Sequence, residues 1–214
     1  MKLVKKIWKY LHVKRKQMYM KKYAVEALEK LYEISSKRNV PIWLEFGTLL
    51  GAVREKGFIP HDDDIDLGMF AENFNYQIER DLYDADFTIL RLFNLRYASR
   101  PNEKSLSEIA LCYKGLQIDI FFFEKCGNNR TCHSFIPSGF NKWAAYEIRF
   151  PFDKFKKIGF LGTEFLVPDK AEECLRCYYG DDFMIPDPNY KGTDKLKPHS
   201  LNYCYAEMIG GWSH

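Results

Sequence analysis

Several features are missing from this 214-residue sequence, and each absence excludes a class of protein. No run of 18 apolar residues occurs, so no segment is predicted to span a membrane as a helix. Lysines interrupt the apolar residues near the N-terminus, which excludes a secretory signal peptide. Repeats, low-complexity tracts and Gly/Ser linkers are lacking, so we expect one domain over residues 23–214. With 46% hydrophobic residues the chain can bury a core, which argues against disorder.

Acidic residues are absent from positions 1–22, which hold nine Lys and Arg. Because the whole chain carries a formal charge of +3, the remaining 192 residues carry −6. A helical projection of this basic leader separates apolar side chains from lysines, and such a helix suits an anionic membrane surface. The alternatives are packing on its own domain and, more weakly, binding nucleic acid, whose phosphates the acidic body would repel. The apolar side comprises Leu3, Val4, Ile7, Trp8, Tyr10 and Leu11, and the basic side comprises Lys2, Lys5, Lys6 and Lys9.

Six cysteines without a signal peptide indicate free thiols in a reducing compartment. Two arrangements leave a structural zinc site open. Cys174 and Cys177 have the two-residue gap of a zinc knuckle, and Cys126, Cys132 and His133 have the right ligand types. No second pair with that gap follows, so we expect ordinary buried cysteines.

The periodicity of apolar residues predicts an α+β fold, with helices packed against one mixed sheet. Helices are predicted at about 18–38, 49–55, 71–83 and 168–180. Strands are predicted at 42–46, 65–69, 87–98, 108–114 and 116–123, with a β-rich stretch over 130–168. The tail from Asp181 is predicted to be loop over a core.

Alternating acidic and apolar residues mark the predicted strand at 65–69. Since side chains on a strand alternate between its faces, Asp62, Asp64 and Asp66 would share one face if the strand extends that far. Ile65, between them, would enter the core. Carboxylates on one face repel one another unless a cation neutralises them. Oxygen ligands suit Mg²⁺ or Mn²⁺, which commonly bridge to substrate phosphates, so we predict a site for metal and phosphate here.

A further aspartate, Asp119, lies between branched apolar residues in the predicted strand at 116–123. No structural role explains an isolated acid in that position. Pairing of this strand with the one at 65–69 would bring Asp119 beside Asp64 and Asp66, which extends the predicted carboxylate cluster.

Upstream, Gly47 and Thr48 lie where a predicted strand gives way to a helix. The free N–H groups and positive dipole of a helix start form a phosphate site. Gly47 permits close backbone approach, and the Thr48 hydroxyl can donate to a phosphate oxygen. Arg54, six residues further on, can pair with phosphate or with the acidic cluster.

The order of these motifs resembles the signature of the nucleotidyltransferase (polymerase β-like) fold. That signature is Gly-Thr, then alternating apolar and Asp residues, then a separate apolar-Asp-apolar strand. More narrowly, WLEFGTLLG at 43–51 and IPHDDDID at 59–66 resemble the LicD/fukutin family. YGDDFMIP at 179–186 is similar to a late Tyr-Gly-Asp motif of that family. The resemblance covers about residues 24–190 and leaves the basic leader outside.

Members of that family transfer phosphocholine or an alditol phosphate from a CDP-linked donor to a sugar hydroxyl of a glycan or lipid-linked oligosaccharide, and release CMP. As a hypothesis for the mechanism, the carboxylates hold Mg²⁺ or Mn²⁺ as cofactor, and Asp119, by its position, accepts the hydroxyl proton. The resemblance assigns metal binding to Asp64, Asp66 and Asp119, phosphate binding to Gly47, Thr48 and Arg54, and an additional acid to Asp62. His61 stands where an aromatic residue is common in the family.

Two other functions remain open at this point. A nucleotidyltransferase that moves NMP from an NTP shares the three carboxylates. A non-catalytic, membrane-docked binding protein could use the same scaffold, although the presence of all three carboxylates argues against it. Fukutin-type relatives carry extra domains and membrane anchors that this sequence lacks. The resemblance therefore favours a cytoplasmic, bacterial-type enzyme that builds capsule or lipopolysaccharide, held at the inner face of the membrane by the leader.

Overall fold

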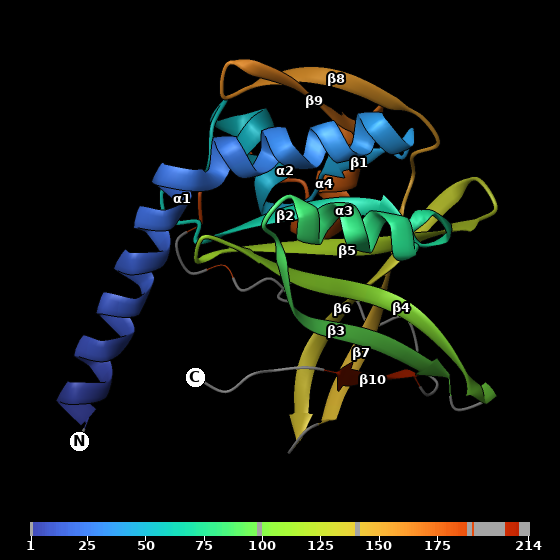
Figure 1. Cartoon of the computed structure of the whole chain (residues 1–214), viewed down its shortest axis with the longest axis horizontal. Coiled ribbons are helices and arrows are strands. Elements are labelled where there is room, and N and C mark those ends of the chain that lie inside the picture. Colours follow the sequence, from blue (N-terminus) through green and yellow to red (C-terminus); the bar gives the residue numbers. More distant parts are fainter. Residues whose placement is uncertain (1, 98–99, 140–141, 188–189, 191–203, 210–214) are drawn as a thin grey trace.

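The computed structural model describes residues 2–97, 100–139, 142–187, 190 and 204–209 (Figure 1). Its helices are α1 (Lys2–Arg38), α2 (Phe46–Arg54), α3 (Tyr76–Asp84) and α4 (Ala171–Tyr179), with a short 3-10 turn, η1 (Ala71–Asn73). Its strands are β1 (Ile42–Leu44), β2 (Asp64–Phe70), β3 (Thr88–Tyr97), β4 (Arg100–Tyr113), β5 (Leu116–Cys126), β6 (Asn129–Gly139), β7 (Lys142–Phe150), β8 (Phe155–Phe160), β9 (Thr163–Pro168) and β10 (Cys204–Ile209).

Eight strands form one mixed sheet in the order β1-β2-β5-β4-β3-β10-β7-β6, and β8 pairs with β9 apart from it. β2 and β5 run parallel, whereas the other pairs are antiparallel. Because β5 also pairs with β6, six of the strands close into a ring. Figure 1 shows the helices gathered over one end of the sheet, with β3, β4, β6, β7 and β10 curving below. The predicted α+β class is confirmed.

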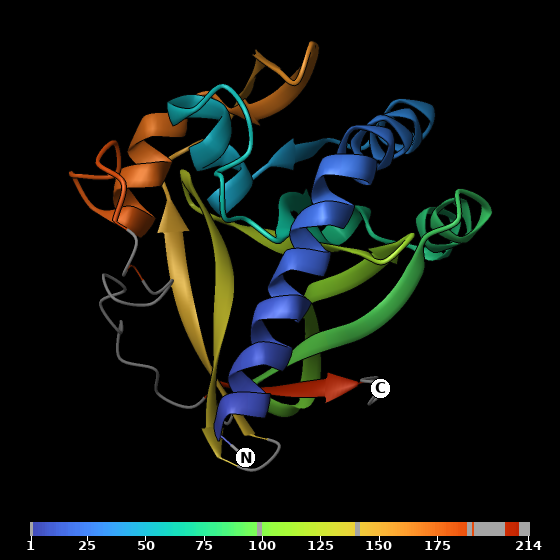
Figure 2. The same cartoon turned by 90° about the vertical axis from the view of Figure 1, so that its left-hand side faces the viewer.

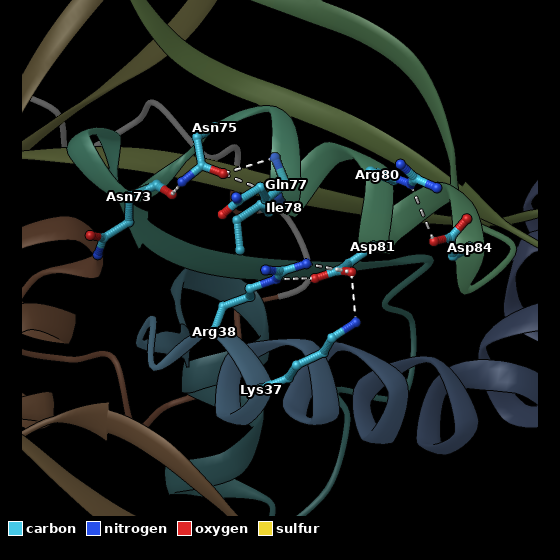
Figure 3. A network of polar contacts seen from close by, with 9 residues as sticks. All are labelled: Lys37, Arg38, Asn73, Asn75, Gln77, Ile78, Arg80, Asp81 and Asp84. Atoms are coloured by element: carbon cyan, nitrogen blue, oxygen red, sulfur yellow. Dashed lines mark hydrogen bonds and ion pairs between the residues drawn. The ribbon is translucent and has the colours of Figure 1, made fainter.

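The C-terminal half of α1 covers the β2–β5 part of the sheet, because its apolar residues recur every three or four positions and are buried there. Ala24, Ala27, Leu28, Leu31 and Ile34 form this buried stripe. α3 lies beside α1 and begins at Asn75, whose Oδ1 accepts the backbone N–H groups of Gln77 and Ile78 (Figure 3).

An ion-pair network fixes these two helices to one another. The buried carboxylate of Asp81 on α3 accepts hydrogen bonds from Lys37 Nζ at 2.9 Å and from Arg38 at the end of α1 (Figure 3). Both cations lower the pKa of Asp81 far below its usual value, with Arg38 the larger cause. This network holds the helical layer in place over the strands that carry the site.

The basic leader is the N-terminal half of α1, and the helix continues through residue 22 without a break. Figures 1 and 2 show this half descending beside the body to the level of β10. Lys16 Nζ lies 3.5 Å from a carboxylate oxygen of Asp63, and the ring of Tyr19 covers Gly115 in the β4–β5 turn. The leader is therefore attached to the body near the carboxylates. Among the described residues, no helix is both long enough and apolar enough to cross a membrane.

The described structure differs from the predicted elements in several places. β4 begins at Arg100 rather than 108, and β1 ends at Leu44 rather than 46. α2 starts at Phe46 rather than 49, because the Glu45 side chain caps it. The predicted helix at 71–83 is split into η1 and α3 at the Asn75 cap. Part of the predicted tail loop is strand β10, which long-range pairing with β3 and β7 stabilises. Residues 191–203 of that tail lie outside the described residues.

Candidate active site

The carboxylates that the sequence singles out lie on two neighbouring parallel strands. Along β2, Ile65 and Leu67 are buried on the helical side, so Asp64 and Asp66 face the opposite side. In the register of β2 with β5, Asp66 is paired with Asp119. The predicted meeting of Asp119 with the β2 aspartates is therefore confirmed.

The start of α2 is fastened to Asp66 by three hydrogen bonds. The backbone N–H of Gly47 donates to Oδ2 of Asp66 at 3.0 Å, and the Thr48 hydroxyl oxygen accepts the backbone N–H of Asp66 at 2.9 Å. The N–H of Glu45 donates to the Asp66 carbonyl at 3.1 Å. Thr48 is fully buried and is not among the described residues that line the cavity below. It positions Asp66, and its contact with a phosphate remains a prediction.

A cavity of about 510 Å³ opens in front of these carboxylates. The predicted site residues that line it are Gly47, Arg54, Asp62, Asp64 and Asp66, together with His61. The opposite wall comes from α4 and the turn after it, which contribute Tyr178, Tyr179 and Phe183. The sequence contained a signal for this wall in the motif at 179–186, although no roles were assigned to its residues.

Arg54 is the cation of the cavity wall. Its NH1 group donates to the carbonyl of Phe183 at 3.0 Å, and its Nε donates to Glu55 at 2.8 Å. The guanidinium therefore links the end of α2 to the turn after α4. Its charge lowers the pKa of Asp62, but burial and the nearby Asp64 outweigh it and raise that pKa to about 7.

Burial and mutual repulsion raise the pKa values of the other carboxylates as well. The pKa of Asp64 rises to about 6 through burial and the charge of Asp119. The pKa of Asp66 rises well above its usual value through burial and the charges of Asp64 and Asp119, of which Asp64 has the larger effect. Oδ2 of Asp62 is buried without a hydrogen-bond partner among the described residues. A divalent cation would relieve both the repulsion and this missing contact, so the donor set fits Mg²⁺ or Mn²⁺. In the described part of the chain, no group of three or more Asp, Glu, His or Cys side chains already has the arrangement that holds a metal ion.

Asp119 is not among the described residues that line the cavity, and other polar groups hold it. Gln117 Nε2 donates to one of its oxygens at 2.8 Å, and Arg91 NH2 donates to the other at 3.2 Å. Arg91 also donates to Glu108 at 3.2 Å. Sequence reasoning missed Arg91 and Glu108, because only the pairing of β3, β4 and β5 brings them to Asp119.

None of the five cysteines whose side chains the structure describes lines this cavity. Cys132 and Cys174 are buried in an apolar cluster around Trp43, while Cys112, Cys126 and Cys177 are also free thiols. Burial raises the pKa of both buried thiols, which keeps them protonated in the apolar cluster. The expectation of buried cysteines holds for these two, whereas Cys126 and Cys177 are exposed and Cys112 is half-buried.

A mixed sheet with two acidic strands side by side, next to a helix start, is the arrangement that the resemblance to a nucleotidyltransferase-type α+β domain predicts. The comparisons agree: residues 39–170 match the family model described as LicD/FKTN/FKRP, nucleotidyltransferase domain, and the chain belongs to this family.

Three relatives illustrate the range of this similarity. Human ribitol-5-phosphate transferase FKTN is 28% identical over 174 residues, which cover 78% of this chain and 34% of the relative. An uncharacterised protein of Rickettsia prowazekii (strain Madrid E) is 39% identical over 75 residues, 31% of this chain and 27% of the relative. An uncharacterised protein of Caenorhabditis elegans is 42% identical over 80 residues, 36% of this chain and 21% of the relative. The matches therefore span about a third or less of these relatives.

Proposed function

We propose that this chain is a phosphotransferase that moves a phospho-substituent from a CDP-linked donor to a sugar hydroxyl of a cell-surface glycan and releases CMP. The observation that carries the proposal is the placement of Asp64 and Asp66 in the cavity wall with Asp119 beside them on the next strand. The similarity to a protein named as a ribitol-5-phosphate transferase supports an alditol phosphate as the transferred group. Phosphocholine is the alternative that the sequence resemblance offers.

The cavity offers matching groups for each part of such a donor. Arg54 supplies a fixed positive charge for the pyrophosphate, and the rings of Tyr178 and Tyr179 supply apolar surface for the nucleoside. Asp64, Asp66 and Asp119 would hold Mg²⁺ or Mn²⁺, which when bound neutralises the charge of the phosphates. Gly47, through its N–H, and Thr48, through its hydroxyl oxygen, keep Asp66 in position for this task.

In the proposed reaction, the acceptor hydroxyl oxygen attacks the phosphorus of the donor that bears the transferred group. A new P–O bond forms to the sugar, and the bond from that phosphorus to the bridging oxygen breaks, so CMP leaves with that oxygen. Asp119 accepts the proton of the attacking hydroxyl on a free lone pair, since Gln117 and Arg91 occupy only part of its accepting capacity. Positioning and charge therefore provide most of the rate.

The test is to incubate the protein and Mg²⁺ with CDP-choline, CDP-ribitol or CDP-glycerol and a glycan acceptor, and to measure CMP. We expect CMP with at least one donor, and a fall of about 100-fold or more in Asp64→Asn and Asp66→Asn, since a metal ligand contributes several kcal/mol. Near-wild-type activity in either variant would contradict the metal assignment. Release of pyrophosphate from an NTP would instead identify a nucleotidyltransferase, and failure to bind Mg²⁺ or CDP in calorimetry would favour a non-catalytic protein.

We also propose that the leader places the enzyme on an anionic membrane surface, at the cytoplasmic face where lipid-linked glycans would be assembled. Val4, Ile7, Trp8 and Leu11 follow one another at helical spacing and are all more than half exposed. An exposed apolar stripe flanked by basic residues is the pattern of a helix that lies in a membrane interface.

A further inference from the structure

A second hollow lies on the same face of the sheet as the carboxylates. It has a volume of about 350 Å³, within the range of small-molecule pockets, and is lined by Arg91, Phe93, Glu108, Phe135 and Trp143. We call it the aromatic pocket. Its residues come from β3, β4, β6 and β7, which belong to the closed ring of strands.

Strand register connects the aromatic pocket to the candidate active site. Asp66, Asp119, Ala110 and Arg91 are successive partners across β2, β5, β4 and β3, so they form one row. Side chains of paired residues point to the same face of a sheet, which places Arg91 on the face of the carboxylates. The hydrogen bond from Arg91 to Asp119 therefore spans the boundary between the pocket and the reacting centre.

Three aromatic rings form a wall with defined geometry. Phe93 stacks on Phe135 with centroids 4.7 Å apart and planes 11° apart, and it meets Trp143 edge to face at 5.2 Å. Phe93 is buried, whereas Phe135 and Trp143 are half-buried and keep ring surface available to a ligand. The negative face of such rings attracts the C–H groups of a flat apolar surface.

Among the described lining residues, Arg91 and Glu108 are the polar groups that meet this wall. Arg91 NH2 lies between Glu108 and Asp119, and its Nε is buried without a hydrogen-bond partner among the described residues. Glu108 is almost fully buried and has acceptor capacity beyond its bond to Arg91. A ligand with one C–H face and several hydroxyls matches this combination, and a sugar ring has both.

We propose that the aromatic pocket binds a sugar ring of the acceptor glycan. This inference rests on the proposed function, in which Arg54 and the tyrosines of the 510 Å³ cavity take the CDP part of the donor. The attacking hydroxyl must approach the phosphorus from the side opposite to the leaving CMP. The aromatic pocket is joined to Asp119 through Arg91, so an acceptor bound there would have its proton acceptor nearby.

Steady-state kinetics test the pocket when transfer activity is present. We expect Trp143→Ala and Phe135→Ala to raise the acceptor KM about tenfold or more, as the loss of a good stacking contact does, while the donor KM stays within about twofold. Trp143→Phe, which keeps an aromatic ring, should recover most of the affinity and also serves if the alanine variant fails to fold. Tyr76→Ala is the matched control, since Tyr76 is an exposed aromatic on α3. An increase in donor KM with an unchanged acceptor KM would overturn the proposal and place the nucleoside here.

A direct binding measurement separates this inference from the proposed function. In a Trp8→Phe, Trp212→Phe background, Trp143 and the buried Trp43 are the remaining tryptophans. We expect methyl glycosides of hexoses and N-acetylhexosamines to change the fluorescence saturably, with no effect of CMP and no response after Trp143→Phe. Saccharide binding without any CMP release in the transfer assay would refute the proposed phosphotransfer and would still support sugar binding in the aromatic pocket. The absence of a saccharide response, or a response to CMP alone, would overturn the pocket.

Discussion

The backbone N–H of Gly47 donates a 3.0 Å hydrogen bond to Oδ2 of Asp66, which joins the first turn of α2 to the carboxylate at the centre of the candidate site. A Cβ added at Gly47 would lie 3.0 Å from that oxygen and 3.6 Å from both carboxylate oxygens of Asp62. The glycine is thus needed for the carboxylates to approach the helix start this closely.

We therefore expect Gly47→Ala to lower kcat/KM about 10- to 100-fold, because small displacements of catalytic groups have effects of this size. Stability should change little, since alanine favours a helix more than glycine does. Gly57→Ala is the matched control, because a Cβ there meets nothing within 4 Å. Equal activity of both variants would contradict the argument. The measurement is CMP release together with thermal unfolding.

The packing of Trp43 on Gly68 gives a prediction about stability rather than activity. A Cβ on Gly68 would lie 2.2 Å from the indole ring, which is itself held by Glu45 and by four phenylalanines. We expect Gly68→Ala to lower the free energy of unfolding in urea by about 1–3 kcal/mol, as overpacked cores do. Gly159→Ala, with open space around the added Cβ, should be neutral. Similar unfolding midpoints for the two variants would refute the proposed clash.

The ion-pair network of Asp81 predicts how stability depends on pH. Arg38 and Lys37 lower the pKa of Asp81 in the folded state, so its contribution is present in full above the unfolded pKa of about 4 and is lost as the pH falls toward the folded pKa. Asp81→Asn should therefore be less stable than wild type at pH 7, and the difference should shrink below about pH 4. Asp84→Asn is the control in the same helix. Asp84 is exposed, and its ion pair with Arg80 is long, at 3.9 Å, and therefore contributes little to stability (Figure 3). The free energy of unfolding in urea is the measurement. If wild type and Asp81→Asn differ by the same amount from pH 7 to pH 2.5, the ionised Asp81 carboxylate is not the cause of the difference.

The exposed stripe of the leader predicts binding to lipid. Deleting residues 1–22 would also remove the contacts of Lys16 and Tyr19 with the body, so point substitutions give a cleaner test. We expect Trp8→Glu with Leu11→Glu to reduce co-sedimentation with vesicles rich in phosphatidylglycerol, and wild-type binding to weaken with salt. Val25→Glu, an exposed apolar position on α1 beyond the leader, should bind as wild type. Wild-type vesicle binding by the double variant would rule out this surface.

Local patterns in the sequence predicted the parts of the fold that depend on neighbouring residues. The alternation of Asp64, Ile65 and Asp66 predicted which side chains of β2 face the core. The isolated Asp119 predicted that its strand, β5, pairs with β2. The same patterns predicted the carboxylates and the cavity residues Gly47 and Arg54.

The features that the sequence did not predict depend on long-range pairing. Arg91 is 28 residues from Asp119 and reaches it only because β4 separates their strands with a fixed register. The hydroxyl of Thr48 is a chemical group that can bind phosphate, yet in the fold its oxygen accepts the backbone N–H of Asp66 on β2. Periodicity carries no information on either point.

The closure of the ring by β10 has a consequence for synthesis on the ribosome. β3 and β7 each pair with β10, which is formed by residues 204–209, more than 100 positions after β3. Until that segment has emerged, the two strands present open edges that can pair with other chains. Both strands contribute walls of the aromatic pocket, so the pocket would be complete only after residues 204–209 have paired with them.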